Sequence, residues 1–267
     1  MLEIIGYFAS ALVGISLGLI GGGGSILTVP VLVYLFHVDA VLATSYSLFI
    51  VGTTSLVGAF PKFRQGLIDV RTALVFGIPS IAAVYLTRLL LVPAIPATVF
   101  TVGNLEVTKS IFMLLLFAVL MVAAAYSMIR KNGKAVSDVP KEARTYNYPL
   151  ILLEGIIVGT LTGLVGAGGG FLIIPALVLL SNLPMKEAVG TSLLIIAAKS
   201  LIGFMGDIGH YELDWVLLLS VTLIAVIGIF IGNRMTRRFD GEKLKKGFGW
   251  FVLLTGVYII VKEIWFK

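Results

Sequence analysis

Two clusters of small residues interrupt long apolar stretches of this sequence, and both could bind an anion through the backbone. Residues 21–25 read GGGGS, and residues 166–170 read GAGGG. Each glycine weakens a helix by roughly 1 kcal/mol relative to alanine, so both clusters predict broken helices. The half-helix after a break presents free N–H groups and the positive end of its dipole, which attract anions. The residues expected to line these sites are Gly22, Gly23, Gly24, Ser25, Gly168, Gly169 and Gly170.

Glycines in apolar helices also allow two helices to cross closely, which is the competing interpretation. We favour it for the Gly-x-x-x-Gly pairs that begin at Gly14 and Gly159. For the contiguous clusters we favour anion binding, because a proline follows each one, at Pro30 and Pro175. Irregular backbone at membrane depth persists only where it is buried in protein or lines a wet cavity. Neither cluster continues as Gly-Lys-Ser/Thr, so neither predicts a P-loop.

One lysine, Lys199, lies inside the apolar stretch 191–204, TSLLIIAAKSLIGF. Charged side chains inside a membrane are costly and by default suggest a functional site. We therefore predict that Lys199 faces a cavity and neutralises a bound anion. The alternative is a lysine whose stem packs on helices while its amine reaches the membrane surface.

Hydroxyl side chains near these positions could donate hydrogen bonds to the oxygens of the same anion. Serine and threonine in membrane helices also bond to their own backbone or to a neighbouring helix, and this alternative stays open for each of them. The hydroxyl residues included in the candidate site are Ser47, Thr54, Ser55, Ser192 and Ser200.

The remaining charged residues indicate no second site. Arg88 and Glu154 lie near the ends of apolar stretches, where we expect them to reach the membrane surface, although either could act as a gate. Asp207 and His210 lie in a segment that we expect to be a solvated loop. The histidines and carboxylates do not have the spacing of a metal site, and there are no cysteines. The sequence predicts no catalytic residue, no metal and no cofactor, and we do not expect an enzyme.

These residues belong to a strongly apolar chain. Of its 267 residues, 58% are hydrophobic and only 13% are charged. A soluble domain carries about 25% charged residues, and a helix needs roughly 20 apolar residues to cross a bilayer. The fold class is therefore an all-α polytopic membrane bundle, with the lipid bilayer and not nucleic acid as its partner. The apolar stretches are 4–36, 41–61, 70–92, 109–130, 149–181, 187–206, 213–233 and 247–264.

The sequence contains two copies of one unit. Residues 14–60 and 159–205 align without a gap at an offset of 145, with identical residues at 18 of 47 positions. The aligned positions include glycines, a proline and two serines, which apolar composition alone does not bring into register. We predict that unit one spans 1–130, a cytoplasmic linker spans 131–148 and unit two spans 149–267.

Basic residues cluster in three connections, at 62–71, 130–144 and 234–246. The positive-inside rule places all three in the cytoplasm. This requires 149–181 to enter and leave the membrane on one side, and the repeat extends the same expectation to 4–36. Each unit then crosses three times, so the two units are inverted relative to each other, an arrangement found in many transporters.

The duplicated block reads G-L-[IV]-G-x-G-G-[SG]-x-[LI]-x-[IV]-P and is followed in both units by A-x-x-x-S-L. It resembles the sulfite exporter TauE/SafE family, also called the toluene sulfonate uptake permease family, and the resemblance covers essentially the whole chain. The resemblance implies transport of sulfite, sulfonates or related organosulfur anions in either direction.

The residues and the resemblance together predict a secondary transporter for a small organosulfur anion in the inner (cell) membrane of a prokaryote. The anion is expected to bind between the two glycine breaks, with alternating access as one unit rocks against the other. The sequence has no ATP-binding motif, so a gradient of the substrate or of a coupling ion, H⁺ or Na⁺, is expected to supply the energy. An anion channel and a membrane-embedded assembly subunit are the alternatives, and assembly as a homodimer is left open.

Overall fold

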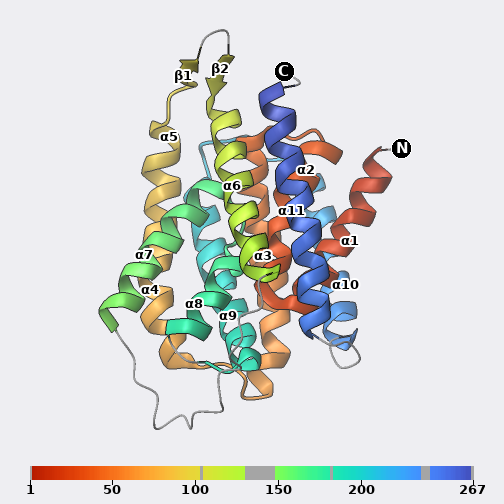
Figure 1. The fold of residues 1–267 in the computed structure, drawn as a ribbon, viewed down its shortest axis with the longest axis vertical. Coiled ribbons are helices and arrows are strands. Elements are labelled where there is room, and N and C mark those ends of the chain that lie inside the picture. The colour runs from red at the N-terminus through yellow and green to blue at the C-terminus, as the bar shows by residue number, and fades with distance from the viewer. Residues whose placement is uncertain (1, 103–104, 130–147, 181–182, 236–240, 266–267) are drawn as a thin grey trace.

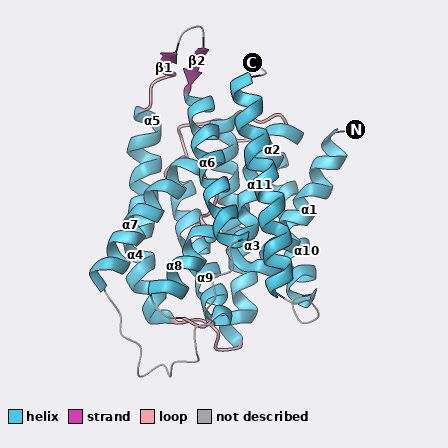
Figure 2. Cartoon of the chain, in the orientation of Figure 1, coloured by secondary structure: helices cyan, strands magenta, loops and turns pink. Residues whose placement is uncertain are grey.

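The computed structural model describes residues 2–102, 105–129, 148–180, 183–235 and 241–265. This part of the chain is almost entirely helical (Figure 2). Seven of its helical stretches are long and apolar enough to cross a membrane, and Pro149–Val165 is a shorter apolar helix. The predicted polytopic all-α membrane bundle is confirmed. Nearly all of the predicted linker at 131–148 lies outside the described residues.

The chain order of the elements is as follows. Unit one contains α1 (Leu2–Ile20), the 3-10 helix η1 (Gly21–Leu27), α2 (Thr28–Leu35), α3 (Ala40–Arg64), α4 (Val70–Leu86), the π-helical segment η2 (Thr87–Leu91), α5 (Val92–Ala94), β1 (Thr98–Val102), β2 (Leu105–Thr108) and α6 (Lys109–Ile129). Unit two contains α7 (Tyr148–Val165), α8 (Gly170–Leu180), α9 (Met185–Met205), α10 (Trp215–Met235) and α11 (Gly241–Trp265).

Aspartates begin three of the long helices. Asp39, Asp69 and Asp214 each accept a hydrogen bond from a backbone N–H in the first turn of α3, α4 and α10, at 2.8–3.0 Å. An acceptor at this position satisfies an N–H group that has no partner within the helix. Asp69 and Asp214 are equivalent in the repeat, so the two copies begin these helices in the same way.

Residues 4–36 form a hairpin, which we call hairpin one (α1, η1 and α2). Its two arms lie together at their outer tips, where the rings of Tyr7 and Phe36 meet edge to face with centroids 5.1 Å apart. At the turn, the backbone of Gly24 packs directly on Ser16. The chain therefore enters the bundle and returns to the end where it started (Figure 1).

Hairpin two consists of α7, the break at 166–169 and α8. Gly169 in the break packs against Thr162 of α7, so α8 folds back beside the helix that precedes it. The predicted broken helix at 149–181 is thus two separate helices joined by four irregular residues.

Four helix pairs make the main contacts of the bundle, namely α3 with α9, α6 with α11, α1 with α10 and α4 with α7. Glycines bring two of these pairs to backbone contact, because Gly14 lies against the Ala225 carbonyl and Gly159 against the Ser80 carbonyl. The packing role expected for these spaced glycines is confirmed. The contacts are equivalent in the repeat, so each hairpin packs on a helix of the other unit.

Both chain termini and the β1–β2 hairpin lie at one end of the bundle (Figure 1). We call this end the β-hairpin end. The connection from α3 to α4 lies at the opposite end, where α6 ends and α7 begins and where α10 ends and α11 begins. Of the three basic connections, 62–71 lies at this end, whereas 130–144 and part of 234–246 lie outside the described residues. The inverted orientation of the two units in a membrane remains a prediction.

The β1–β2 hairpin is an element that the sequence did not predict. It forms within the connection 93–109, which is rich in the β-branched residues that favour strands. Its strands pair antiparallel, with Thr101 opposite Glu106 and Val102 opposite Leu105.

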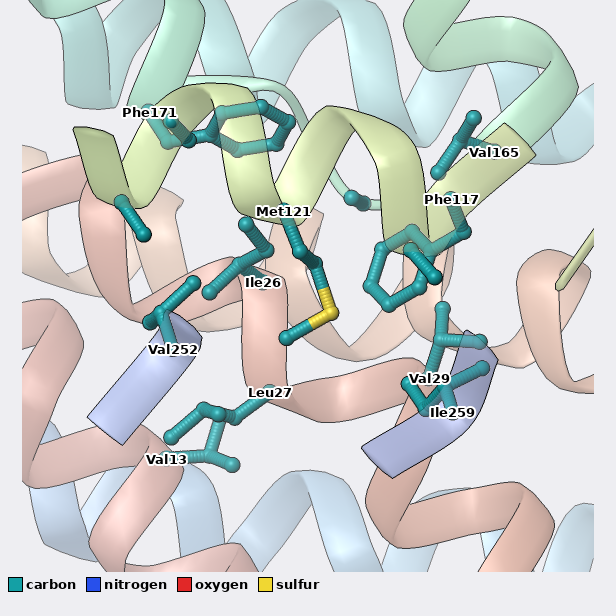
Figure 3. Close-up of a cluster of buried hydrophobic side chains, with 14 of the residues drawn as sticks. Val13, Ile26, Leu27, Val29, Phe117, Met121, Val165, Phe171, Val252 and Ile259 are labelled. Carbon is teal, nitrogen blue, oxygen red and sulfur yellow. The ribbon is translucent and has the colours of Figure 1, made fainter. Parts of the chain in front are cut away.

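An apolar cluster covers one side of both glycine breaks (Figure 3). Ile26 beside the first break and Val165 and Phe171 beside the second pack with Phe117 and Met121 of α6. Residues of α11 close the same cluster. On another side, glycines of the breaks contact α3 and α9, since Gly168 lies against Val51 and both Gly22 and Gly168 lie against Ile196.

Candidate functional site

The break in hairpin two requires glycine at several positions. Gly166, Gly168 and Gly169 have φ values of +71°, +64° and +71°. Residues other than glycine rarely adopt this left-handed backbone conformation, because it places their Cβ atom against the following carbonyl oxygen. Helix α8 begins at the next residue, Gly170. The N–H groups of Leu172 and Ile173 donate to the Gly169 carbonyl at 3.0 Å, which leaves the N–H groups of Gly170 and Phe171 without an acceptor within the helix. The glycines fix the chain in a shape that turns a helix N-terminus into the bundle.

The break in hairpin one is different. It begins with Gly21 at φ +74° but continues as a regular 3-10 helix from Gly21 to Leu27 and runs directly into α2. Ser25 donates its hydroxyl hydrogen to the Gly22 carbonyl at 2.7 Å. Because 3-10 hydrogen bonds use the N–H groups within the segment, this break exposes fewer donors than the break in hairpin two.

The two breaks meet each other directly. A methyl group on either Gly22 or Gly170 would overlap the backbone of the other. Beside this contact, the Cβ atom of Ser25 lies 3.5 Å from the point that a Cβ on Gly168 would occupy. The structure thus brings the two predicted glycine clusters together, but the contact fills the space between Gly22 and Gly170 with backbone.

Lys199 lies at the break of hairpin two. Its side chain is 0% exposed, and its amine is 2.7 Å from the point that a Cβ on Gly169 would occupy. The ammonium donates a hydrogen bond to the Thr162 hydroxyl oxygen at 2.9 Å, which is its only hydrogen bond within the described residues. An ammonium has three hydrogens to donate, so two are left for a further ligand. Complete burial excludes the alternative in which the amine reaches the membrane surface.

The Thr162 hydroxyl is a site residue that the sequence did not predict. It accepts from Lys199 and donates to the Gly159 carbonyl of its own helix at 3.2 Å. It therefore orients the ammonium toward the break. Only the fold-back of hairpin two brings Thr162 to Lys199, and the sequence did not specify that geometry.

The candidate hydroxyls fall into two groups. Thr54, Ser55 and Ser200 are buried on α3 and α9, and none has a hydrogen-bond partner among the described residues. Ser47 is also buried and unpartnered, but it lies two helical turns from Thr54, roughly 10 Å along the axis. Ser192 donates to the Val189 carbonyl at 2.9 Å, as expected for a serine that bonds to its own helix.

The site is charged in one unit only. At the repeat offset, Lys199 and Thr162 correspond to Thr54 and Leu17, and Gly24 packs on the Leu17 backbone as Gly169 packs on Thr162. The same local packing thus holds a charged pair in unit two and an uncharged pair in unit one. The ammonium beside the breaks therefore comes from α9 of unit two, and unit one has no counterpart to it.

Arg88 and Asp207 do not lie at the surface of the protein, where the sequence predicts them to lie. Arg88 is 0% exposed and Asp207 is 1% exposed, and the two form an ion pair. The expected position at the membrane surface for Arg88 and the expected solvated position for Asp207 are therefore wrong. Arg88 lies in the apolar stretch at the π-helical segment η2, and Asp207 follows the end of α9, where a turn folds it back into the bundle.

A cavity of about 290 Å³ opens at the β-hairpin end of the bundle, between α2, α6 and α11. Its charges are mixed, since it is lined by Asp39, Lys262 and Glu263. Glu263 accepts a hydrogen bond from the Tyr34 hydroxyl at 3.1 Å, and the Lys262 amine lies over the Tyr34 ring. The side chains that line this cavity therefore carry both signs of charge, whereas Lys199 has no carboxylate partner among the described residues.

Comparison with known proteins identifies the family. Residues 7–259 match the family described as Sulfite exporter TauE/SafE. A protein of Xylella fastidiosa (strain 9a5c), named "Probable membrane transporter protein", is 28% identical over 257 residues, which cover 94% of this chain and 92% of the relative. "Probable membrane transporter protein YdhB" of Bacillus subtilis (strain 168) is 30% identical over 235 residues, covering 88% and 90%.

No solved structure matches this chain significantly. The family match covers nearly the whole chain, and the relatives are full-length matches named as membrane transporters. Together with the seven apolar helices, these matches place the protein in the cell membrane as a multi-pass integral protein. The chain belongs to the TauE/SafE sulfite exporter family of membrane transporters.

Proposed function

We propose that this membrane transporter is a secondary transporter for a small organosulfur anion, such as sulfite or a sulfonate. We propose further that the anion binds where Lys199 meets the break of hairpin two. The observation that carries the site is the buried ammonium of Lys199, whose only hydrogen bond within the described chain goes to Thr162. The family name supports the class of anion, and transport without an enzymatic reaction is part of the proposal.

The electrostatics of Lys199 favour an anionic ligand. Burying an ammonium costs several kcal/mol even after the protein relaxes, unless an opposite charge compensates it. Lys199 makes no ion pair with a carboxylate in the described part of the chain. An anion bound beside the ammonium would supply the negative charge that compensates this buried positive charge.

The donors around Lys199 suit an oxyanion with several oxygens on one sulfur. The ammonium, the first N–H groups of α8 and the buried hydroxyls of α3 and α9 are different kinds of donor on different elements. Helix N-termini bind sulfate-like groups through N–H groups and the helix dipole. The hydroxyls of Thr54 and Ser200 are buried and unpartnered in the described part of the chain, and they lie on the paired helices α3 and α9, so they are the hydroxyls that we propose as further donors.

The packing suggests which parts move during transport. Rocking of unit one against unit two would separate α1 from α10 and α4 from α7, although glycines hold both pairs at backbone contact. We therefore propose that each hairpin moves together with the helix of the other unit on which it packs. The direct contact between Gly22 and Gly170 is then the interface that changes as access alternates.

The test is anion flux in proteoliposomes, with Lys199→Met as the main variant. Methionine has a similar shape but no charge, so the core packing is largely kept. Wild-type protein should take up labelled sulfite or sulfoacetate under a substrate, H⁺ or Na⁺ gradient, and Lys199→Met should not. Lys186→Met is the matched control, because Lys186 lies on the same helix but is exposed. No wild-type flux with any of these anions and gradients contradicts the proposal.

The same vesicles distinguish a carrier from a channel. A carrier shows saturable uptake and counterflow, in which unlabelled anion inside drives transient accumulation of labelled anion. A channel shows neither. Flux that is linear in concentration, without counterflow, would replace the proposed transporter by an anion channel with the same site.

A further inference from the structure

The ion pair of Arg88 and Asp207 lies close to the proposed anion site but is separate from it. We propose that Arg88 is a second anion-binding residue, on the path from Lys199 to the β-hairpin end. In the present conformation the carboxylate of Asp207 is paired with the guanidinium of Arg88. During transport, the anion replaces this carboxylate as the partner of the guanidinium. This inference rests on the proposed function, since it describes the next position of the same anion.

The guanidinium of Arg88 is held as a receptor for a planar or pyramidal oxyanion. Its Nε donates to both carboxylate oxygens of Asp207, at 2.9 and 2.8 Å, and its Nη2 donates to the same carboxylate. The rigid fork of an arginine matches two oxygens on one atom, whether that atom is carbon, phosphorus or sulfur. Asp207 therefore occupies a position that a sulfite or sulfonate group would also fit.

The other side of the guanidinium is anchored independently of Asp207. Nη1 donates to the Thr44 hydroxyl at 2.9 Å and to the Gly163 carbonyl at 3.2 Å. These contacts connect Arg88 to α3 and α7. If Asp207 moves away, the anchored guanidinium remains in place with Nε and Nη2 free to bind another anion.

Arg88 and Lys199 bind consecutive residues of α7. Lys199 donates to the Thr162 side chain, and Arg88 donates to the carbonyl of Gly163. An anion that leaves Lys199 along α7 toward the β-hairpin end therefore meets Arg88 next.

Both partners lie on segments suited to a local change of shape. Arg88 belongs to a π-helical segment, and such segments are frequent at functional sites. Asp207 follows α9 in a short turn, which also contains Gly209 at φ +90°. The helix α9 that carries Lys199 is thus connected directly to the carboxylate that competes for Arg88.

The competing interpretation is that the ion pair only braces the fold. At the repeat offset, Arg88 and Asp207 correspond to Asn233 and Lys62, so the second copy does not reproduce this charge pattern. Asn233 is half-buried, and its buried side-chain oxygen has no hydrogen-bond partner among the described residues. A brace required by the duplicated fold would be expected in both copies, whereas a residue of a one-sided anion path would not.

The deciding variant is Asp207→Asn, which keeps the shape of the side chain but frees the guanidinium of its counterion. Purified protein is titrated with sodium sulfite in a gluconate background, and the unfolding temperature is recorded. A ligand that binds only the folded state raises this temperature with concentration. We expect the dissociation constant for sulfite, obtained from the dependence of this temperature on concentration, to fall by about tenfold or more, the factor for one charge-assisted contact. The double variant Arg88→Gln/Asp207→Asn should lose this gain, and the exposed Glu212→Gln should match wild type.

The outcomes separate the inference from the proposed function. If wild type binds sulfite and Asp207→Asn binds it no better, the ion pair is a brace and only the inference is overturned. If Asp207→Asn binds sulfite and wild type does not, Arg88 is supported and the Lys199 site is overturned. If neither binds it, both are overturned.

Should Asp207→Asn not yield folded protein, Arg88→Lys provides the second measurement. Lysine keeps the charge opposite Asp207 but lacks the fork. We expect sulfite flux in proteoliposomes to fall at least about fivefold while the unfolding temperature stays close to wild type. Wild-type flux in Arg88→Lys would overturn the inference.

Discussion

Substitution of Gly169 by alanine tests the geometry of the site most sharply. The residue has φ +71°, and a Cβ there would lie 2.7 Å from the Lys199 amine and would overlap the Thr162 side chain. The left-handed backbone costs alanine roughly 1–2 kcal/mol. Displacing two buried side chains that already pack closely costs about 1–3 kcal/mol more. We therefore expect Gly169→Ala to lose about 2–5 kcal/mol of unfolding free energy.

Gly66→Ala is the matched control for the backbone contribution. Gly66 has nearly the same φ, +69°, but no atom lies within 4 Å of the position that its Cβ would occupy. Its cost should therefore be limited to the roughly 1–2 kcal/mol of the left-handed conformation. The difference between the two variants isolates the contact with Lys199 and Thr162.

Equilibrium unfolding in mixed micelles and sulfite titration measure the two expected effects. Gly169→Ala should be less stable than Gly66→Ala, and its sulfite affinity should be lower by about tenfold or more, which corresponds to about 1.4 kcal/mol. Gly66→Ala should bind sulfite as wild type does. Equal stability of the two variants, with wild-type sulfite affinity in Gly169→Ala, would refute the placement of Lys199 at the break.

Three further predictions follow from the same contacts. Thr162→Val should weaken sulfite binding roughly fivefold in a thermal-shift titration, because it removes a net hydrogen bond of about 1 kcal/mol that orients the ammonium; unchanged affinity would remove Thr162 from the site. Ser192→Ala should leave sulfite flux unchanged, since Ser192 bonds only to its own helix among the described residues; a large loss of flux would show that this serine contacts the anion. Single cysteines can be introduced into this cysteine-free chain at Gln65, Glu212 and Glu242. An impermeant maleimide added to whole cells should label only Glu212→Cys, and labelling of Gln65→Cys or Glu242→Cys would contradict the inverted topology.

The general architecture was predictable because membrane burial leaves a strong pattern in the sequence. Apolar stretches of the required length predicted the helices, and the offset of 145 predicted which residues are equivalent. Lys199 was predicted to face a cavity and neutralise an anion, because a charged side chain in the middle of an apolar stretch usually faces the interior of a bundle. Its complete burial confirms the interior position, and its role toward an anion stays a prediction. Its neighbour Thr162 was missed, because the fold-back of hairpin two determines that contact.

Arg88 and Asp207 show where the sequence is ambiguous. An arginine near the end of an apolar stretch can reach the membrane surface or pair inside the bundle, and the sequence does not distinguish the two. Asp207 lies just beyond α9 among polar residues that resemble a solvated loop. Its burial depends on the turn after α9, which points the carboxylate back toward a helix 119 residues away in sequence. Likewise, the direct contact of Gly22 with Gly170 could be known only from the relative position of the two hairpins.

The position of a bound anion tests the central claim most directly. Selenite is a close analogue of sulfite, and its selenium scatters anomalously, so diffraction from crystals soaked in selenite locates it without a model of the ligand. We expect the strongest anomalous peak beside the Lys199 amine, at the N-terminus of α8. A peak only in the cavity between α2, α6 and α11, or no peak at a concentration that saturates transport, would contradict the proposed site.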